Sequence, residues 1–277
     1  MSKKPTATAL AVNNKSEAQE ITTLDNVPDY LKGNEKNTGL EALGQSDFKV
    51  PRIKLLQPLS PEIRSFQGKA IPGEFWHTGS NTSLGSEFNM ICCIASKRVI
   101  LWKPREEGGG MLAFSRDGKT WSNGGNQKFT VKLKGVKQPV TWETGKDVKS
   151  SGLTDWGSFN PEDLESGPAA QISYEYLCYL PEAPAMSPVV MGLSRTAVTN
   201  AKSFNTSLLM LRKPIQSVMV RCFSDEKSEG DAAWWVPNFE MKGFVSADLY
   251  NVAKNIAEKQ ADYNTEYNEE DTGTEAF

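Results

Sequence analysis

The sequence has few of the residues from which catalytic and metal-binding sites are usually built. It contains one histidine, His77, and four cysteines, none of them in a CxxC pair. Cys92 and Cys93 are adjacent in the apolar run MICCIA, and Cys178 and Cys222 lie in similarly apolar surroundings. Because zinc sites and disulfide frameworks need spaced, converging sulfurs, we expect reduced core thiols, no metal and no cofactor.

Long apolar runs are also lacking. No segment approaches the roughly 18 apolar residues that a membrane-spanning helix requires, and the N-terminus, MSKKPTATAL, lacks the apolar stretch of a signal peptide. Acidic residues such as Asp155 stand beside Gly, Pro and Ser in turn-like contexts, which do not favour acid–base or magnesium chemistry. We therefore expect a cytoplasmic protein that makes no membrane contact and is not an enzyme.

The formal net charge of −3 is distributed unevenly along the 277 residues. Residues 262–277 contain six acids and no Lys or Arg, which leaves 31 bases against 28 acids in the rest of the chain. Residues 97–149 hold twelve bases against five acids, interleaved with aromatic rings. Such a mixture of cations and flat rings is typical of grooves that bind single-stranded nucleic acid.

Individual residues of this basic segment are predicted to bind nucleic acid. Lysines and arginines contact phosphates, and each ring that stacks on a base contributes about 1 to 3 kcal/mol whatever the base. The predicted phosphate contacts are Lys103, Arg105, Arg116, Lys119, Lys128, Lys132 and Lys134. Trp121 and Trp142, which are next to turns and lysines, are predicted to stack on bases, with Trp102 as a third ring. The alternative is a solvated strand face above core tryptophans.

The composition divides the chain into three parts. Residues 1–48 are rich in Lys, Asn, Thr, Ser and Glu and cannot bury enough apolar surface to offset the entropy of ordering, so we expect a flexible arm. A folded domain is predicted over residues 49–262, beginning near VPRIKLLQPLSPEI, and an acidic tail over residues 263–277.

Strand patterns dominate the predicted folded domain. They cover residues 88–102, 111–121 with a hairpin at Asp117-Gly118, 128–134, 139–144, 171–180, 187–193, 215–223 and 232–239. Helices are predicted after the N-cap candidates Ser194 and Ser246. This pattern predicts a β-rich (α+β) fold: an antiparallel OB-like barrel with insertions and about two helices.

The tail, ending TEYNEEDTGTEAF, places an apolar ring beside the terminal carboxylate. This arrangement suits a pocket that is basic at its rim and apolar inside, so the tail is predicted to bind partner proteins. The predicted partner-binding residues are Glu269, Glu270, Asp271, Glu275 and Phe277. An acidic segment can also occupy a cationic groove of its own protein, so the tail and nucleic acid would compete. The alternative is a solubilising tail.

Two groups of residues resemble known families. Glu275-Ala276-Phe277, after Glu269-Glu270-Asp271, resembles the acidic, Phe-ended tails of bacterial and phage single-stranded DNA-binding proteins, with Ala276 where the bacterial tails usually have proline. VPRIKLLQ, LWKPREEGGG and the Asp-Gly turn followed by Trp121 are similar to segments of a group of tailed-phage proteins, over roughly residues 50–250. The resemblance implies a phage replication or recombination accessory factor in the cytoplasm of a bacterial host.

Three functional hypotheses follow from these patterns. The first is a non-catalytic phage protein that coats single-stranded DNA without sequence specificity and recruits replication or recombination proteins through its tail. The second is a protein-binding inhibitor or assembly factor that does not bind DNA. The third is a single-strand annealing recombination protein, which would form rings or filaments on DNA. All three are compatible with a homo-oligomer.

Overall fold

The computed structural model describes residues 50–102, 110–122, 128–131, 140–143, 145–160, 163, 165–230 and 232–261, together with Gly39 and Ala42. The chain divides into two units, Met1–Phe48 and Lys49–Phe277, and all the elements described below belong to the second. The predicted acidic tail lies outside the described residues, as does the predicted arm apart from Gly39 and Ala42.

Strands account for most of the regular structure. They are β1 (Arg52–Leu55), β2 (Phe75–His77), β3 (Thr82–Ser83), β4 (Glu87–Trp102), β5 (Met111–Ser115), β6 (Lys128–Val131), β7 (Val140–Glu143), β8 (Ala170–Tyr179), β9 (Val189–Ser194), β10 (Val218–Glu229) and β11 (Ala232–Phe244). The α-helices are α1 (Pro61–Ser65), α2 (Val198–Met210) and α3 (Ala247–Ala261). Short 3-10 helices cover Lys149–Ser151, Pro184–Met186, Arg195–Ala197 and Ile215–Ser217.

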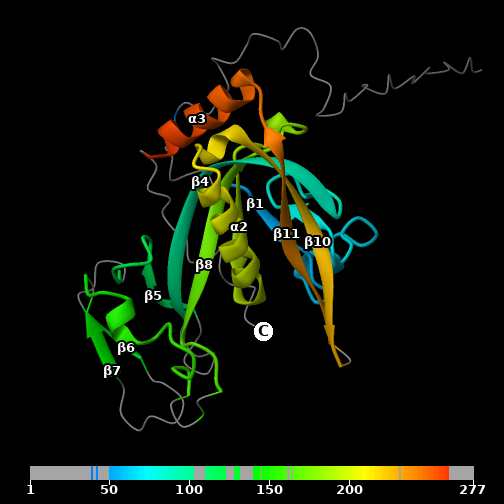
Figure 1. Ribbon diagram of the computed structural model, residues 1–277. Coiled ribbons are helices and arrows are strands. Elements are labelled where there is room, and N and C mark those ends of the chain that lie inside the picture. The colour runs from blue at the N-terminus through cyan, green and yellow to red at the C-terminus, as the bar shows by residue number, and fades with distance from the viewer. Residues whose placement is uncertain are drawn as a thin grey trace, which may run out of the picture. The chain divides into compact units, whose positions relative to one another are not determined.

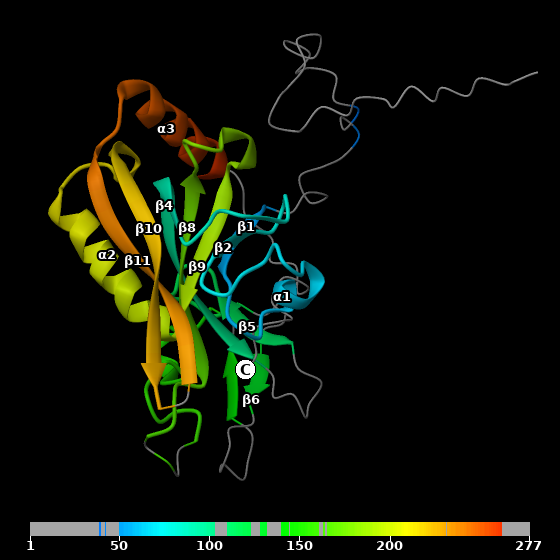
Figure 2. The ribbon, with the colours of Figure 1, turned by 90° about the vertical axis from the view of Figure 1, so that its right-hand side faces the viewer.

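Nine strands form one mixed sheet in the order β11-β10-β4-β8-β9-β1-β2-β3, with β5 paired to β4. Figure 1 labels β1, β4, β5, β8, β10 and β11 of this sheet. Its pairings are antiparallel apart from β1 with β9, which is parallel. The prediction of a β-rich fold is confirmed, whereas the expectation of an antiparallel sheet is corrected to a mixed one. The sheet is strongly curled (Figure 2). β6 and β7 form a separate two-stranded ladder.

The inside of the curl is filled by the main hydrophobic core. One cluster contains side chains from β1, β2, β4, β8, β9 and β10, and only a curled sheet can bring these strands to one interior. Helix α2 contributes Ala201, Phe204 and Leu208, spaced so that they share one helix face. The Tyr176 hydroxyl donates to Asn205 Oδ1 at 2.8 Å and ties α2 to β8.

The other face of the sheet is covered by α3. Alternate residues of β4 face opposite ways, so Met90 and Cys92 belong to the α2 core while Ile91 and Cys93 pack with Ala253 of α3. The four cysteines are free and buried, as predicted for core thiols. Desolvation is the main reason that the pKa of Cys93 rises to about 12, which leaves its thiol protonated at neutral pH.

A buried ion cluster joins three strands of the sheet, β1, β4 and β8. Glu175 on β8 is 4% exposed, and its carboxylate lies 3.1 Å from Arg52 Nη2 and 2.6 Å from Arg98 Nε. Gly192 on β9 makes room for Arg52, because a Cβ there would lie 3.0 Å from Nη2. Removing one member of such a cluster would leave a buried charge without its partner, which is costly.

Candidate nucleic-acid interface

The C-terminal end of β4 and the N-terminal end of β8, which pair with each other, carry a small lobe with its own core. We call it the Trp121 lobe and define it as residues 110–122, 145–160 and 165–170. Its core consists of Trp121, Val148 and Leu153 packed with residues from β4, β5 and β8. Backbone hydrogen bonds from Trp121 N to Lys146 O and from Val148 N to Lys119 O join two of its turns. The lobe therefore brings together residues from several parts of the predicted basic segment.

The first turn is organised by Asp117. Its carboxylate accepts hydrogen bonds from the N–H groups of Lys119 and Thr120 and from the Ser115 hydroxyl. Desolvation acts to raise the pKa of Asp117, but these donors outweigh it and the pKa falls to about 2. Gly118 follows with a φ of 67°, and a Cβ there would press on the Lys97 side chain at 3.0 Å. These contacts explain the Asp-Gly pair in the hairpin.

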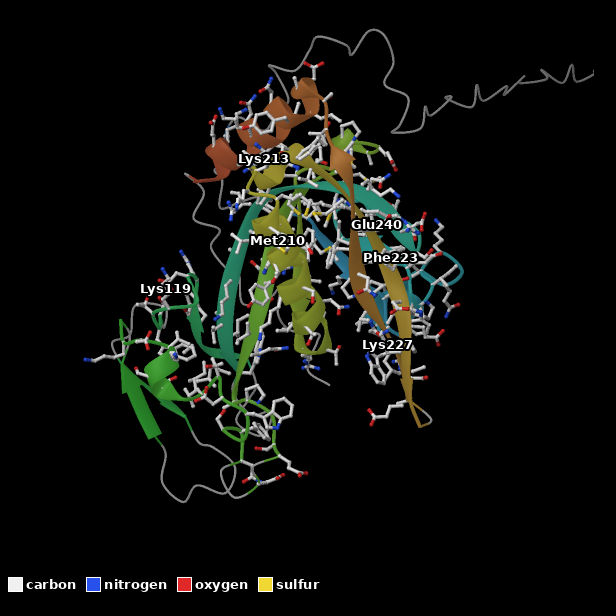
Figure 3. All side chains as sticks on the ribbon, viewed as in Figure 1. Lys119, Met210, Lys213, Phe223, Lys227 and Glu240 are labelled. Atoms are coloured by element: carbon white, nitrogen blue, oxygen red, sulfur yellow. The ribbon has the colours of Figure 1, made fainter. Side chains whose placement is uncertain are left out.

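Four exposed bases stand on the two joined turns. They are Arg116 and Lys119 on the first and Lys146 and Lys149 on the second, and Lys119 is labelled in Figure 3. Arg116 lies over the Phe114 ring, 5.5 Å from its centroid. The acids of these turns accept hydrogen bonds from backbone N–H groups: Asp117 as above, and Asp147 from Ser150 N at 2.8 Å. The turns thus concentrate cations that the sequence scatters over residues 116–149.

The predicted role of Trp121 in base stacking is wrong for this structure. Its side chain is 1% exposed and lies in the core of the lobe. A ring enclosed on both faces has no surface on which a base could stack. Turns and lysines flank Trp121 in sequence, but the ring itself points inward against Val148 and Leu153.

For the other predicted nucleic-acid contacts, the structure gives only their position or register, or does not describe them. Trp102 is half-buried at the end of β4, and its indole N–H donates to Gln171 Oε1 at 3.2 Å. In the β6–β7 ladder Lys128 is in register with Glu143, and Trp142 with Phe129. Their roles stay predictions. Lys103, Arg105, Lys132 and Lys134 lie outside the described residues, as do the predicted partner-binding residues Glu269, Glu270, Asp271, Glu275 and Phe277.

Two exposed rings of the lobe were missed by the sequence analysis. Trp156 is 73% exposed and Phe159 is 52% exposed. Their loop is held by Ser158, whose hydroxyl donates to Leu153 O and accepts from Ala169 N. Asp155, Asp163 and Glu165 are exposed in the same loop, so the charged residues that neighbour these rings in the sequence are acids, whereas the bases are on the two turns. A search for rings among bases therefore passed over both of them.

Comparison with known proteins adds a family. The family model described as Pam3 phage gp34-like protein matches residues 16–266. The chain belongs to this family. The match spans the sheet, the Trp121 lobe, α2 and α3 of this gp34-like chain. No curated protein and no solved structure matches it.

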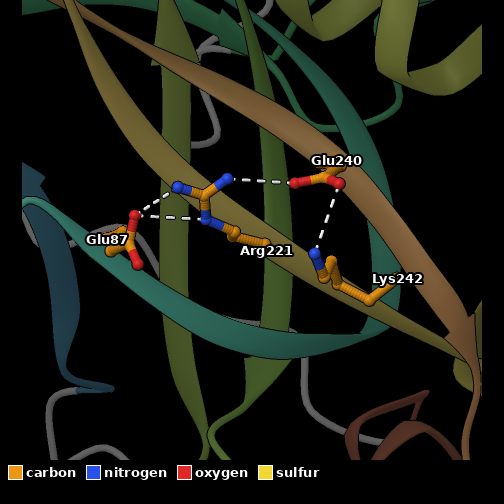
Figure 4. A network of polar contacts seen from close by, with 4 residues as sticks. All are labelled: Glu87, Arg221, Glu240 and Lys242. Carbon is orange, nitrogen blue, oxygen red and sulfur yellow. Dashed lines mark hydrogen bonds and ion pairs between the residues drawn. The ribbon is translucent and has the colours of Figure 1, made fainter.

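A second charged group of the gp34-like chain lies on β4, β10 and β11 and is neutralised internally. Arg221 pairs with Glu87 and with Glu240, and Lys242 pairs with Glu240 at 3.3 Å (Figure 4). Hydrogen bonds from Arg221 and Lys242 hold the pKa of Glu240 below its usual value. The balanced charges of this group make it a poor phosphate site.

Other kinds of site are not found in the described part of the gp34-like chain. No three His, Cys, Asp or Glu side chains there gather in a way that could hold a metal ion. His77 is 3% exposed and bonded to Ser80 and to the Met186 carbonyl. No helix within the described ranges is long and apolar enough to cross a membrane.

Proposed function

We propose that this phage protein binds single-stranded DNA without sequence specificity, through the Trp121 lobe and without catalysis. The observation that carries the proposal is the gathering of Arg116, Lys119, Lys146 and Lys149 on two joined turns. Cations held together in this way bind a polyanion by releasing its condensed counterions, whatever the sequence.

The exposed rings supply the second part of the proposed mechanism. Trp156 and Phe159 project from the loop that follows the cationic turns. A single strand offers unstacked bases, whereas a duplex does not, so a lobe that carries both exposed rings and cations favours single strands. In this proposal the turns hold phosphates and the loop takes bases, with Trp156 in the role first assigned to Trp121.

The remaining predictions form part of the same proposal. The protein acts in replication or recombination in the bacterial cytoplasm, and its acidic tail recruits partner proteins. An OB-type barrel has five strands, whereas the described sheet has nine, so an OB core would be a subset of this sheet. Residues 103–109 and 132–139 include further predicted phosphate contacts.

A titration of fluorescently labelled oligo-dT, followed by anisotropy, tests this function. Replacing Trp156 and Phe159 by Ala should weaken binding by about 1 to 3 kcal/mol for each ring that stacks on a base. Leu209→Ala with Phe244→Ala is the matched control, because both side chains are exposed and lie on α2 and β11 instead of the lobe. Equal affinity of the loop variant and the wild-type protein would contradict the assigned role of the rings. Equal binding of duplex and single strand would contradict the preference for single strands.

A further inference from the structure

A groove of about 320 Å³ lies between α2 and β11, away from the Trp121 lobe. Its polar lining includes Ser203 and Ser207 of α2, whose hydroxyls make no hydrogen bond to any other described residue. Phe204 and Phe239 also line it, with their rings stacked at a centroid distance of 4.4 Å. The groove thus offers hydrogen-bonding groups above an aromatic floor.

The edge of β11 beside this groove is open over a short stretch. Gln57 bonds the N–H and C=O of Trp235, and Asn200 bonds the C=O of Pro237. Backbone groups of alternate strand residues point the same way, so those of Phe239 and Met241 point to this edge too. Within the described residues these groups have no partner there. An extended peptide could therefore add to the sheet at Phe239 and Met241.

Exposed apolar side chains continue from the groove along both elements. Met241 lines the groove, and Phe244 follows it on β11 with 67% of its surface exposed. Leu209 and Met210, in the last turn of α2, are 78% and 77% exposed. Large exposed apolar groups on neighbouring elements mark a surface for protein contacts.

The charge of this face selects the partner. Residues 195–217 contain four bases and no acid. The exposed Arg212 and Lys213 lie two and three residues beyond the end of α2, and Figure 3 labels Met210 and Lys213. On β11, Glu240 is already paired with Arg221 and Lys242. A second copy of the chain would bring like charges together, whereas an acidic segment would complement them.

We propose that the α2–β11 groove docks an extended, acidic segment of a partner protein that carries large apolar side chains. The partner's backbone pairs with Phe239 and Met241, its apolar side chains contact Met210 and Phe244, and its acids face Arg212 and Lys213. This surface is separate from the one assigned to DNA.

A binding assay with the full chain tests the proposal. The probe is a short fluorescein-labelled peptide in which Asp alternates with Leu and Phe, compared with the same peptide carrying Lys for Asp. The acidic probe should bind and the basic one should not. Charge reversal by R212E with K213E should weaken binding at least about tenfold, because like-charge contacts are costly. K254E with K259E is the matched control on α3, which covers the opposite face of the sheet.

A second pair of variants tests strand addition. Met241→Pro removes the outward N–H, and proline is tolerated on a strand edge where that group does not serve the ladder. Met241→Pro should weaken binding of the acidic probe at least tenfold. Met241→Val keeps the N–H and should bind the probe like the wild-type protein. Similar binding of both variants, or of both peptides, would overturn the proposal. If a peptide with the sequence of residues 262–277 binds more tightly than the acidic probe, the groove belongs to the chain's own tail. If oligo-dT displaces the acidic probe, the groove belongs to DNA. Either result would overturn the docking of a separate protein.

Discussion

Gln57 and Trp235, 178 residues apart, are joined by two hydrogen bonds. Gln57 Nε2 donates to Trp235 O at 2.9 Å, and Trp235 N donates to Gln57 Oε1 at 3.0 Å. A side-chain amide thus does for β11 what the backbone of a neighbouring strand would do. Gly73 leaves space for the Trp235 ring, since a Cβ there would lie 2.6 Å from Nε1. The pair links the chain just after β1 to β11 and so bridges the opening of the curled sheet.

Replacing Gln57 by Ala should remove both hydrogen bonds between residue 57 and Trp235. The backbone groups of Trp235 would lose both partners, and each lost hydrogen bond costs about 0.5 to 1.5 kcal/mol. We expect a lower free energy of unfolding in urea and faster hydrogen exchange of the Trp235 amide. Unchanged exchange at Trp235 would show that the side-chain bridge does not protect β11.

Truncation of Trp121 should lower the free energy of unfolding far more than truncation of Trp156. Trp121→Ala removes a ring that is 1% exposed, so the free energy of unfolding should fall by about 3 to 5 kcal/mol. Trp156→Ala removes an exposed ring, and its effect on stability should stay within about 0.5 kcal/mol. Denaturant unfolding of both variants measures the difference. Comparable stability losses would contradict the placement of the two rings.

His77 should make the protein less stable in mild acid. Desolvation by burial is the main cause that lowers its pKa below 6.5, and the hydrogen bond to the Met186 carbonyl only partly offsets it. The unfolded chain therefore takes up a proton more readily than the folded one as the pH falls below 6.5. The free energy contributed by neutral His77 is present above pH 6.5 and is lost as the pH falls towards the lower, folded-state pKa. As His77 is the one histidine in the sequence, its imidazole NMR signals report the titration directly. A titration midpoint above 6.5 would mean that His77 stabilises the folded protein in mild acid, and would contradict this prediction.

Glu175 should contribute strongly to the stability of the folded protein. Glu175→Gln would leave Arg52 and Arg98 partly buried without their shared carboxylate, and breaking a buried pair costs about 3 to 5 kcal/mol. Glu182→Gln is a matched control, because Glu182 accepts a hydrogen bond from Asn89 in an exposed setting. Thermal unfolding of the two variants should separate them by several degrees. Equal midpoints would show that the cluster contributes little to stability.

Local patterns in the sequence predicted the long strands and the two longer helices. The apolar, β-branched run at residues 88–102 corresponds to β4 (Glu87–Trp102), and Ser246 precedes α3, where its hydroxyl accepts from Leu249 N. The short helix α1 and strand β1 were not predicted. β1 has only four residues after a proline, and its parallel pairing with β9 joins segments far apart in the chain.

The site was less predictable because residue type does not give side-chain direction. Trp121 has turns and a lysine as sequence neighbours, but its burial depends on Val148 and Leu153, which arrive from a later segment. Trp156 follows an acid, so the search for bases beside rings did not find it. The Asp117-Gly118 turn was predictable because its contacts are local.

The dependence of oligo-dT affinity on salt tests the central claim most directly. If the cations of the Trp121 lobe bind phosphates, a plot of log affinity against log salt should be linear with a slope of about −0.7 for each phosphate, or roughly −3 to −5 in all. Replacing Lys119 and Lys149 by Ala should make the slope shallower by about 1.4. A flat plot, or no binding at low salt, would contradict the account.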